Sequence, residues 1–111
     1  IANALAAENL RLGRAVVADC VNPVQASRDG WRQTALLGSA RLAEIEVICS
    51  DVALHRRRAE VRTSDIVGLT LPTWHEIANR HYEPWDREHL LLDTAHESID
   101  RLLQRVEIYL S

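Results

Sequence analysis

An acidic residue follows a short apolar run near the start of the chain. Residues 15–18 are all apolar, Asp19 comes directly after them, and Asn22 lies three residues further on. A carboxylate at the end of a buried strand can hold Mg²⁺ during phosphoryl transfer, because Mg²⁺ prefers hard oxygen ligands. Many buried strands also end in an acid that only caps the next helix. Asp19 is therefore a candidate metal ligand with a structural alternative.

An arginine cluster is the second candidate for chemistry. Residues 55–58 read His-Arg-Arg-Arg, and Arg62 follows four positions after Arg58. In a regular helix these two arginines share a face, and guanidinium groups that face a cleft can neutralise a phosphoryl group in transfer. The alternative is a solvated basic face. The arginines directly precede an aperiodic stretch that contains glycine, as a closing lid requires, so we expect Arg58 and Arg62 to be catalytic.

Aromatic residues mark a third region. Trp74, Tyr82 and Trp85 could line a substrate pocket or anchor an insertion in the core, and Arg80 beside them is either an anion contact or a surface charge. Residues 75–79 begin like the zinc motif H-E-x-x-H, but asparagine replaces the second histidine, which excludes a metalloprotease site.

The elements that must position these residues alternate between strand and helix. Short apolar runs predict strands at 15–18, 42–49 and 89–93, each followed by a helix-forming pattern. This order predicts a parallel sheet with helices on its faces. The expected helices cover 1–12, a segment capped by Asn22 that ends near residue 37, a segment capped by residues 50–51 that contains the arginines, a short stretch from 72 to about 81, and 95–110.

Composition limits the classes of function. The 111 residues are 47% hydrophobic and 26% charged, with a net charge of −3, which indicates a folded domain rather than a disordered tail. An acidic chain is a poor candidate for nucleic-acid coating, and no stretch has the ~20 apolar residues of a membrane span. Cys20 and Cys49 are expected to be buried free thiols, which favours a reducing, cytoplasmic setting.

The order of parts resembles a known family, the small-molecule P-loop kinases related to chloramphenicol phosphotransferase, gluconate kinase, the zeta toxins and the polynucleotide kinase domain. The segments that carry the resemblance are 16–23, 46–51, 55–58, 71–74 and 82–85. They are similar to a bacterial branch described as AAA family ATPases or predicted kinases. The resemblance implies an α/β fold with a P-loop NTPase-type parallel sheet, flanking helices and a helical lid. It implies ATP and Mg²⁺ as cofactors.

The resemblance also implies roles for individual residues. Asp19 matches the Walker-B-like acid that holds the metal, and Asn22 lies in the loop on the substrate side, where we also expect Arg80 and Tyr82. Arg58 and Arg62 match lid arginines that reach the nucleotide phosphates. Three further residues are expected at the nucleotide: Arg57, Asp93 and Thr94.

The chain departs from the family in one large respect. It contains no G-x-x-x-x-G-K-[ST] loop and no lysine, so the phosphate-binding loop and its strand are expected to lie outside this chain. Residues 1–111 would then be the carboxyl-terminal part of a single kinase domain, with residues 55–88 as lid and substrate-side insertion. In this fold the P-loop strand lies between the strand of 15–18 and that of 42–49. We therefore expect the segment to be unstable alone and to need its own amino-terminal part or a complementing chain.

Three functions follow from these expectations. The first is an ATP-dependent kinase that moves a γ-phosphoryl group to a hydroxyl of a small molecule. The alternative is a nucleotide-binding regulatory or toxin-like module without that activity. The third is a non-catalytic interaction domain, which is favoured only if no P-loop accompanies the chain.

Overall fold

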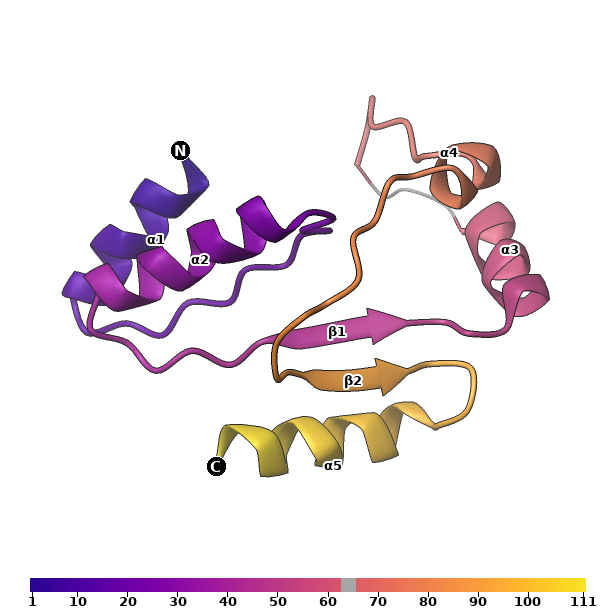
Figure 1. Ribbon diagram of the computed structural model, residues 1–111. Coiled ribbons are helices and arrows are strands. Elements are labelled where there is room, and N and C mark those ends of the chain that lie inside the picture. The colour runs from indigo at the N-terminus through magenta and orange to yellow at the C-terminus, as the bar shows by residue number, and fades with distance from the viewer. Residues whose placement is uncertain (63–65) are drawn as a thin grey trace. The chain divides into compact units, whose positions relative to one another are not determined.

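The structure is a computed structural model that describes residues 1–62 and 66–111 (Figure 1). The chain forms two compact units. The first unit is Ile1–Leu42 with His81–Arg87, and the second is Ala43–Arg80 with Glu88–Ser111. Residues of the lid predicted at 55–88 therefore belong to both units.

Two helices form the first unit. Helix α1 (Ala2–Arg11) packs on helix α2 (Gln25–Leu37), and small side chains, Ala6, Ala7 and Ala35, are buried there. Asn3 Nδ2 donates a hydrogen bond of 2.9 Å to Thr34 Oγ1 across the same contact. Because the buried residues are small, the two helices can approach each other closely.

Helix α2 begins later than its sequence pattern suggests. Its N-cap is Val24, so the prediction that Asn22 caps it is wrong. Asn22 instead has a left-handed backbone with φ of 46°, which asparagine tolerates better than most residues. The first helical N–H, that of Gln25, donates 3.0 Å to Glu83 Oε1, a cap supplied by a residue 58 positions away.

The strand predicted at residues 15–18 is not formed. These residues have no regular secondary structure, and the side chain of Val17 is 92% exposed. An apolar run becomes a strand only when a neighbouring strand takes up its backbone hydrogen bonds. The prediction of a buried thiol at Cys20 is also wrong, because Cys20 is exposed in this segment without regular structure. Both cysteines are free, as expected.

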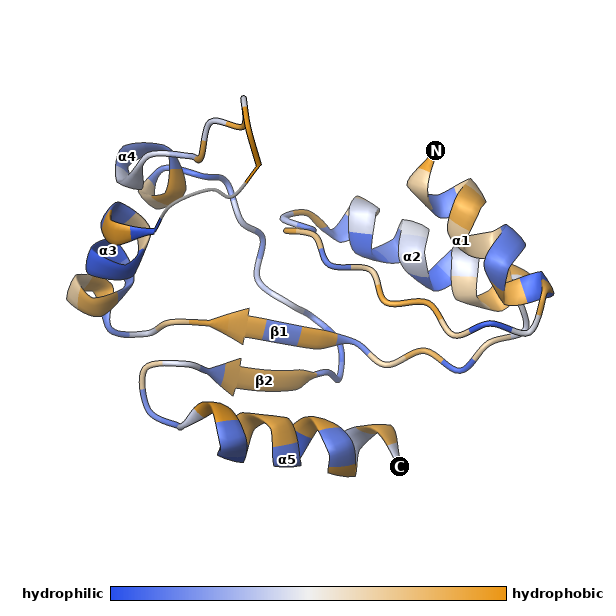
Figure 2. Ribbon diagram, turned by 180° about the vertical axis from the view of Figure 1, so that it is seen from behind, coloured by the Kyte–Doolittle hydropathy of each residue, from blue (hydrophilic) through white to orange (hydrophobic). Residues whose placement is uncertain are grey.

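The second unit contains the parallel strand pair. Strand β1 (Ile45–Ile48) pairs with strand β2 (Leu90–Asp93) in parallel, which confirms two of the predicted strands and their direction. Helix α5 (Ile99–Leu110) packs on β2, where Leu92 and Leu102 are buried. Hydrophobic residues predominate along both strands (Figure 2). The side chain of Val47 in β1 is nevertheless 62% exposed.

Side-chain caps begin the helices that follow β1 and β2 in this unit. Asp51 Oδ1 accepts 3.1 Å from Leu54 N and starts helix α3 (Val52–Val61), as predicted. Thr73 and Glu76 form a capping box at helix α4 (Trp74–Ala78). Helix α5 starts at Ile99 with Ser98 as its cap, later than predicted, because the residues after β2 form turns.

The aperiodic stretch predicted after the arginine helix lies partly at 63–65, outside the described residues. Within the described ranges, none of the helices is both long and apolar enough to cross a membrane.

Candidate functional site

The predicted site residues divide between the two units. Three lie in the first unit: Asp19, Asn22 and Tyr82. Six lie in the second unit: Arg57, Arg58, Arg62, Arg80, Asp93 and Thr94. Each unit therefore carries its own group of candidates.

The carboxyl ends of β1 and β2 bring Arg58 and Thr94 together. Arg58 Nη1 donates to Thr94 Oγ1 at 3.1 Å and to the Thr94 carbonyl at 3.3 Å, and Nη2 reaches the same carbonyl at 3.4 Å. Thr94 itself is fixed to β1, because its N–H and hydroxyl donate to the Ile48 carbonyl at 2.8 and 3.0 Å. An arginine of α3 is thus bonded to the loop that follows β2.

Asp93 stabilises the same loop through its carboxylate. Oδ1 accepts from Ser50 N at 3.1 Å and from Ala95 N at 3.0 Å. Hydrogen bonds from Ser50 and then from the Ala95 backbone hold the pKa of Asp93 below its ordinary value, and His96 adds a smaller electrostatic contribution. The carboxylate therefore stays ionised and links the turn after β1 to the turn after β2.

Ser50 and His96 lie beside Asp93, although neither was a predicted site residue. Ser50 Oγ lies 3.0 Å from His96 Nε2, and Asp93 Oδ2 lies 3.8 Å from the same nitrogen. A catalytic triad needs the acid at the other ring nitrogen, where it orients the imidazole, so the arrangement does not match that of a serine hydrolase. We call Ser50, Arg58, Asp93, Thr94 and His96 the edge cluster.

The edge cluster is exposed and carries both signs of charge. Arg58, Ser50 and His96 are exposed, while Asp93 and Thr94 are half-buried. Cys49 lies beside it and is also half-buried rather than buried, with its Sγ 3.8 Å from Arg58 Nη1. The exposed guanidinium can take an anionic ligand, whereas the acid and the threonine are occupied in holding the loop.

The side chain of Arg62 bonds to a different segment from that of Arg58. Helix α3 ends at Val61, and Arg62 is its C-cap, with φ of −70° and ψ of 150°. Its Nη2 donates 3.1 Å to the Pro72 carbonyl, whereas Arg58 bonds to Thr94. The expectation that Arg58 and Arg62 share one face of a regular helix is therefore wrong, whereas their catalytic role stays a prediction.

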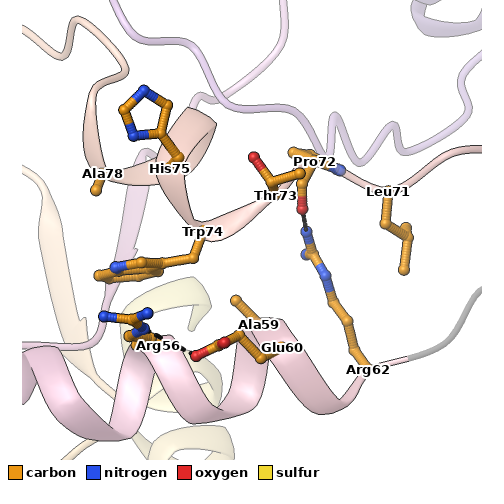
Figure 3. A pocket seen from close by; sticks show the side chains of 10 residues that line it. All are labelled: Arg56, Ala59, Glu60, Arg62, Leu71, Pro72, Thr73, Trp74, His75 and Ala78. Atoms are coloured by element: carbon orange, nitrogen blue, oxygen red, sulfur yellow. Dashed lines mark hydrogen bonds and ion pairs between the residues drawn. The ribbon is translucent and has the colours of Figure 1, made fainter.

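An open pocket of about 770 Å³ lies between α3 and α4, and Arg62 is one of the residues that line it (Figure 3). Trp74 forms part of its wall and contacts the His55 ring edge-on, with 5.0 Å between ring centres. Arg56 Nε and Glu60 Oε1 form an ion pair of 2.9 Å on the α3 side. The lining residues are Arg56, Ala59, Glu60, Arg62, Leu71, Pro72, Thr73, Trp74, His75 and Ala78.

The remaining lid and substrate candidates of the second unit, Arg57 and Arg80, are exposed. Neither belongs to the edge cluster, and neither lines the pocket between α3 and α4. Their expected contacts with nucleotide and substrate stay predictions.

In the first unit, Asn22 and Tyr82 are connected through Arg28. Arg28 Nε donates 2.9 Å to the Asn22 carbonyl, and its guanidinium lies 5.0 Å from the centre of the Tyr82 ring. Tyr82 is 41% exposed, and its hydroxyl accepts 2.9 Å from Trp85 Nε1. Two predicted substrate residues that are 60 positions apart in sequence therefore share one cluster.

Asp19 is exposed in a segment without regular structure. Within residues 1–62 and 66–111, no group of three or more His, Cys, Asp or Glu side chains is arranged to hold a metal ion. Asp19 therefore offers a single carboxylate and not a metal cage made by the described residues alone.

Comparison with protein-family models, curated proteins and solved structures gives no match.

Local sequence contained a partial signal for the residues that were missed. Ser50 directly follows a predicted strand, and His96 lies three residues after Asp93, which is a turn spacing. Arg28 had no such signal, because its partners Glu83 and Pro84 are more than 50 positions away.

Proposed function

We propose that this chain is the carboxyl-terminal part of an ATP-dependent phosphotransferase of the P-loop kinase type, which moves a γ-phosphoryl group to a hydroxyl of a small molecule. The observation that carries the proposal is the edge cluster. At the carboxyl ends of the parallel strands β1 and β2, Arg58 of α3 is bonded to Thr94 in the loop after β2. In parallel α/β sheets, ligands bind outside the carboxyl ends of the strands, so the exposed guanidinium of Arg58 is in a suitable place.

In the proposed reaction the protein acts mainly by positioning and by neutralising charge. Arg58 exchanges its bonds with Thr94 for a nucleotide phosphate, and Arg57 and Arg62 add positive charge from the same segment. Asp93 and Thr94 shape the loop on the nucleotide side, since their polar groups are already used within it. Asn22 and Tyr82 of the first unit are the proposed substrate contacts there, and Arg80 of the second unit is a separate substrate candidate.

The donor chemistry of Asp19 fits Mg²⁺ in a shared site. Mg²⁺ is usually bound by one or two carboxylates together with substrate phosphates, and an exposed carboxylate such as Asp19 can serve as one of these ligands. The bound ion supplies charge stabilisation on the transferring phosphates.

The chain has no lysine, so the phosphate-binding loop of the proposed enzyme comes from residues outside it. The two free cysteines are consistent with a reducing compartment, and we place the proposed enzyme in the cytoplasm.

Calorimetry on the full-length protein that contains these residues tests nucleotide binding, with ATP and Mg²⁺ as ligands. We expect saturable binding, followed by ADP formation that depends on an added hydroxyl compound. No binding of ATP with Mg²⁺ refutes the proposal. Binding without transfer to any hydroxyl compound supports the alternative, a nucleotide-binding regulatory or toxin-like module.

The variant Arg58→Ala tests the edge cluster directly. We expect phosphoryl transfer to fall about 100-fold or more, as for removal of one preorganised donor at developing negative charge. Arg101→Ala, an exposed arginine of α5, is the matched control and should keep full activity. Thr94→Val leaves Arg58 in place but removes the hydroxyl that Arg58 contacts and that holds the loop to the Ile48 carbonyl of β1. An equal loss in Thr94→Val and Arg58→Ala would mean that Arg58 acts only by holding the loop.

A further inference from the structure

Arg28 of α2 is a buried charge whose acceptors are backbone carbonyls. It is 2% exposed. Its Nε donates to Asn22 O at 2.9 Å, its Nη2 to Glu83 O at 2.7 Å and its Nη1 to Pro84 O at 3.3 Å. A buried guanidinium is stable only when such hydrogen bonds replace water, so these three carbonyls are held at fixed positions around one planar group.

Two aromatic rings complete this arrangement. The guanidinium carbon of Arg28 lies 4.4 Å from the centre of a Trp85 ring and 5.0 Å from that of Tyr82. Trp85 Nε1 donates 2.9 Å to Tyr82 Oη, which joins the two rings to each other. Stacking on a cation and a hydrogen bond between the rings together restrict the side-chain rotamers of both aromatic residues.

A second set of bonds joins the same two segments without Arg28. Glu83 N donates 2.7 Å to Pro23 O, and Gln25 N donates 3.0 Å to Glu83 Oε1. The segment His81–Arg87 is therefore fixed to the turn before α2 at several points, and Arg28 lies in the middle of them.

Burial decides which role Arg28 can have. A side chain that is 2% exposed is not accessible to a ligand, and three of its five N–H groups already donate to backbone carbonyls. Its effect must pass through Asn22, whose carbonyl it fixes in a left-handed turn, and through Tyr82, whose ring it contacts and which is 41% exposed. These two residues are the substrate candidates of this unit.

We propose that Arg28 is a positioning residue of the first unit that holds Asn22 and Tyr82 in one arrangement for binding of the hydroxyl acceptor, and that it does not contribute to nucleotide binding. The proposal rests on the proposed phosphotransferase function. Lysine cannot replace Arg28, because a single ammonium group cannot reach three carbonyls and stack on two rings at the same time.

The test compares Arg28→Lys and Arg28→Met with Arg32→Met in the full-length protein. Arg32 lies one turn further along α2 and is exposed, so it is the matched control. Glycerol, glucose and adenosine serve as hydroxyl probes, and the kinetics are measured on whichever probe the wild-type protein phosphorylates. We expect the KM for that probe to rise about 10-fold or more in both Arg28 variants, while the KM for ATP and kcat stay within about twofold of wild type.

Two kinetic outcomes overturn the proposal. An unchanged probe KM removes the positioning role, and an equal rise in the KM for the probe and for ATP indicates general destabilisation instead. If the wild-type protein phosphorylates no probe although it binds ATP with Mg²⁺, the assignment of an acceptor side fails, whereas a failure to bind ATP refutes the proposed function itself.

A second pair of variants covers the case in which Arg28 variants do not fold. Glu83→Ala removes the carboxylate bonded to Gln25 N and leaves Arg28 intact, whereas Glu83→Gln keeps an oxygen that can accept the same bond. We expect Glu83→Ala to raise the probe KM severalfold and Glu83→Gln to restore it. Equal KM values in the two variants would contradict the idea that fixing this segment positions the acceptor.

Discussion

Replacing glycine by alanine at two positions near the contact between α1 and α2 is expected to change the unfolding free energy in opposite directions. Gly38 follows α2 as its C-cap, with an ordinary φ of −87°, so alanine fits its backbone. A Cβ at Gly38 would lie 2.6 Å from Leu10 Cβ and 2.8 Å from Leu10 Cδ1. Carbon atoms in contact prefer about 3.5 to 4.0 Å, so α1 would have to move outward by about 1 Å.

The expected cost of Gly38→Ala is about 1 to 3 kcal/mol of unfolding free energy, the usual range for overpacking. Gly30→Ala, in the interior of α2, is the matched control because its nearest atom is Asn3 Nδ2 at an ordinary 3.8 Å. There the helix propensity of alanine should stabilise the protein by about 0.5 to 1 kcal/mol. The two variants should therefore shift stability in opposite directions.

Thermal unfolding of the full-length protein by calorimetry, supported by urea denaturation, measures both shifts. Adding Leu10→Ala to Gly38→Ala removes the Cδ1 contact but keeps the 2.6 Å Cβ contact, so we expect only partial recovery. Destabilisation by Gly30→Ala equal to that by Gly38→Ala, or full recovery in the double variant, would refute the described packing of Leu10 on Gly38.

Two further predictions concern the second unit. Asp51→Ala should lower the unfolding free energy by about 1 kcal/mol, because Asp51 caps α3 at Leu54 N, and Asp51→Asn should restore most of it in the same denaturation assay. The lowered pKa of Asp93 should make the protein more stable above the ordinary aspartate pKa of 3.8, and this contribution should be lost as the pH falls through the lower folded value. Unfolding midpoints measured between pH 3 and 7 should therefore differ most between wild type and Asp93→Asn at the higher pH, and a constant difference would contradict the assigned hydrogen bonds.

Local patterns predicted the second unit well. Apolar runs of strand length found β1 and β2, and alternation of strand and helix predicted their parallel pairing. Asp51 was recognised as a cap because capping depends only on residues within one helical turn. The cap is set by neighbours in sequence, and the parallel pairing follows from the general rule for alternating strands and helices, so the sequence was sufficient for both.

Long-range requirements explain what was missed. Residues 15–18 have the composition of a strand, but a strand needs a partner, and none pairs with them among the residues that the structure describes. Asn22 did not cap α2, because Glu83, a distant residue, supplies the bond to Gln25 N. Burial of Arg28 likewise depends on carbonyls more than 50 positions away. No local pattern contains that information.

The contrast between Arg28 and Arg58 shows why composition could not separate structural from functional arginines. All thirteen basic residues of the chain are arginines. Arg28 is buried and donates to three carbonyls from two segments, so removing its side chain would break all three bonds between these segments and leave a gap between them. Arg58 is exposed and bonds mainly to Thr94, so water can replace those bonds and the guanidinium is able to turn to an anionic ligand. Exposure and the number of segments contacted, rather than residue type, are therefore the grounds on which we propose positioning for Arg28 and ligand binding for Arg58.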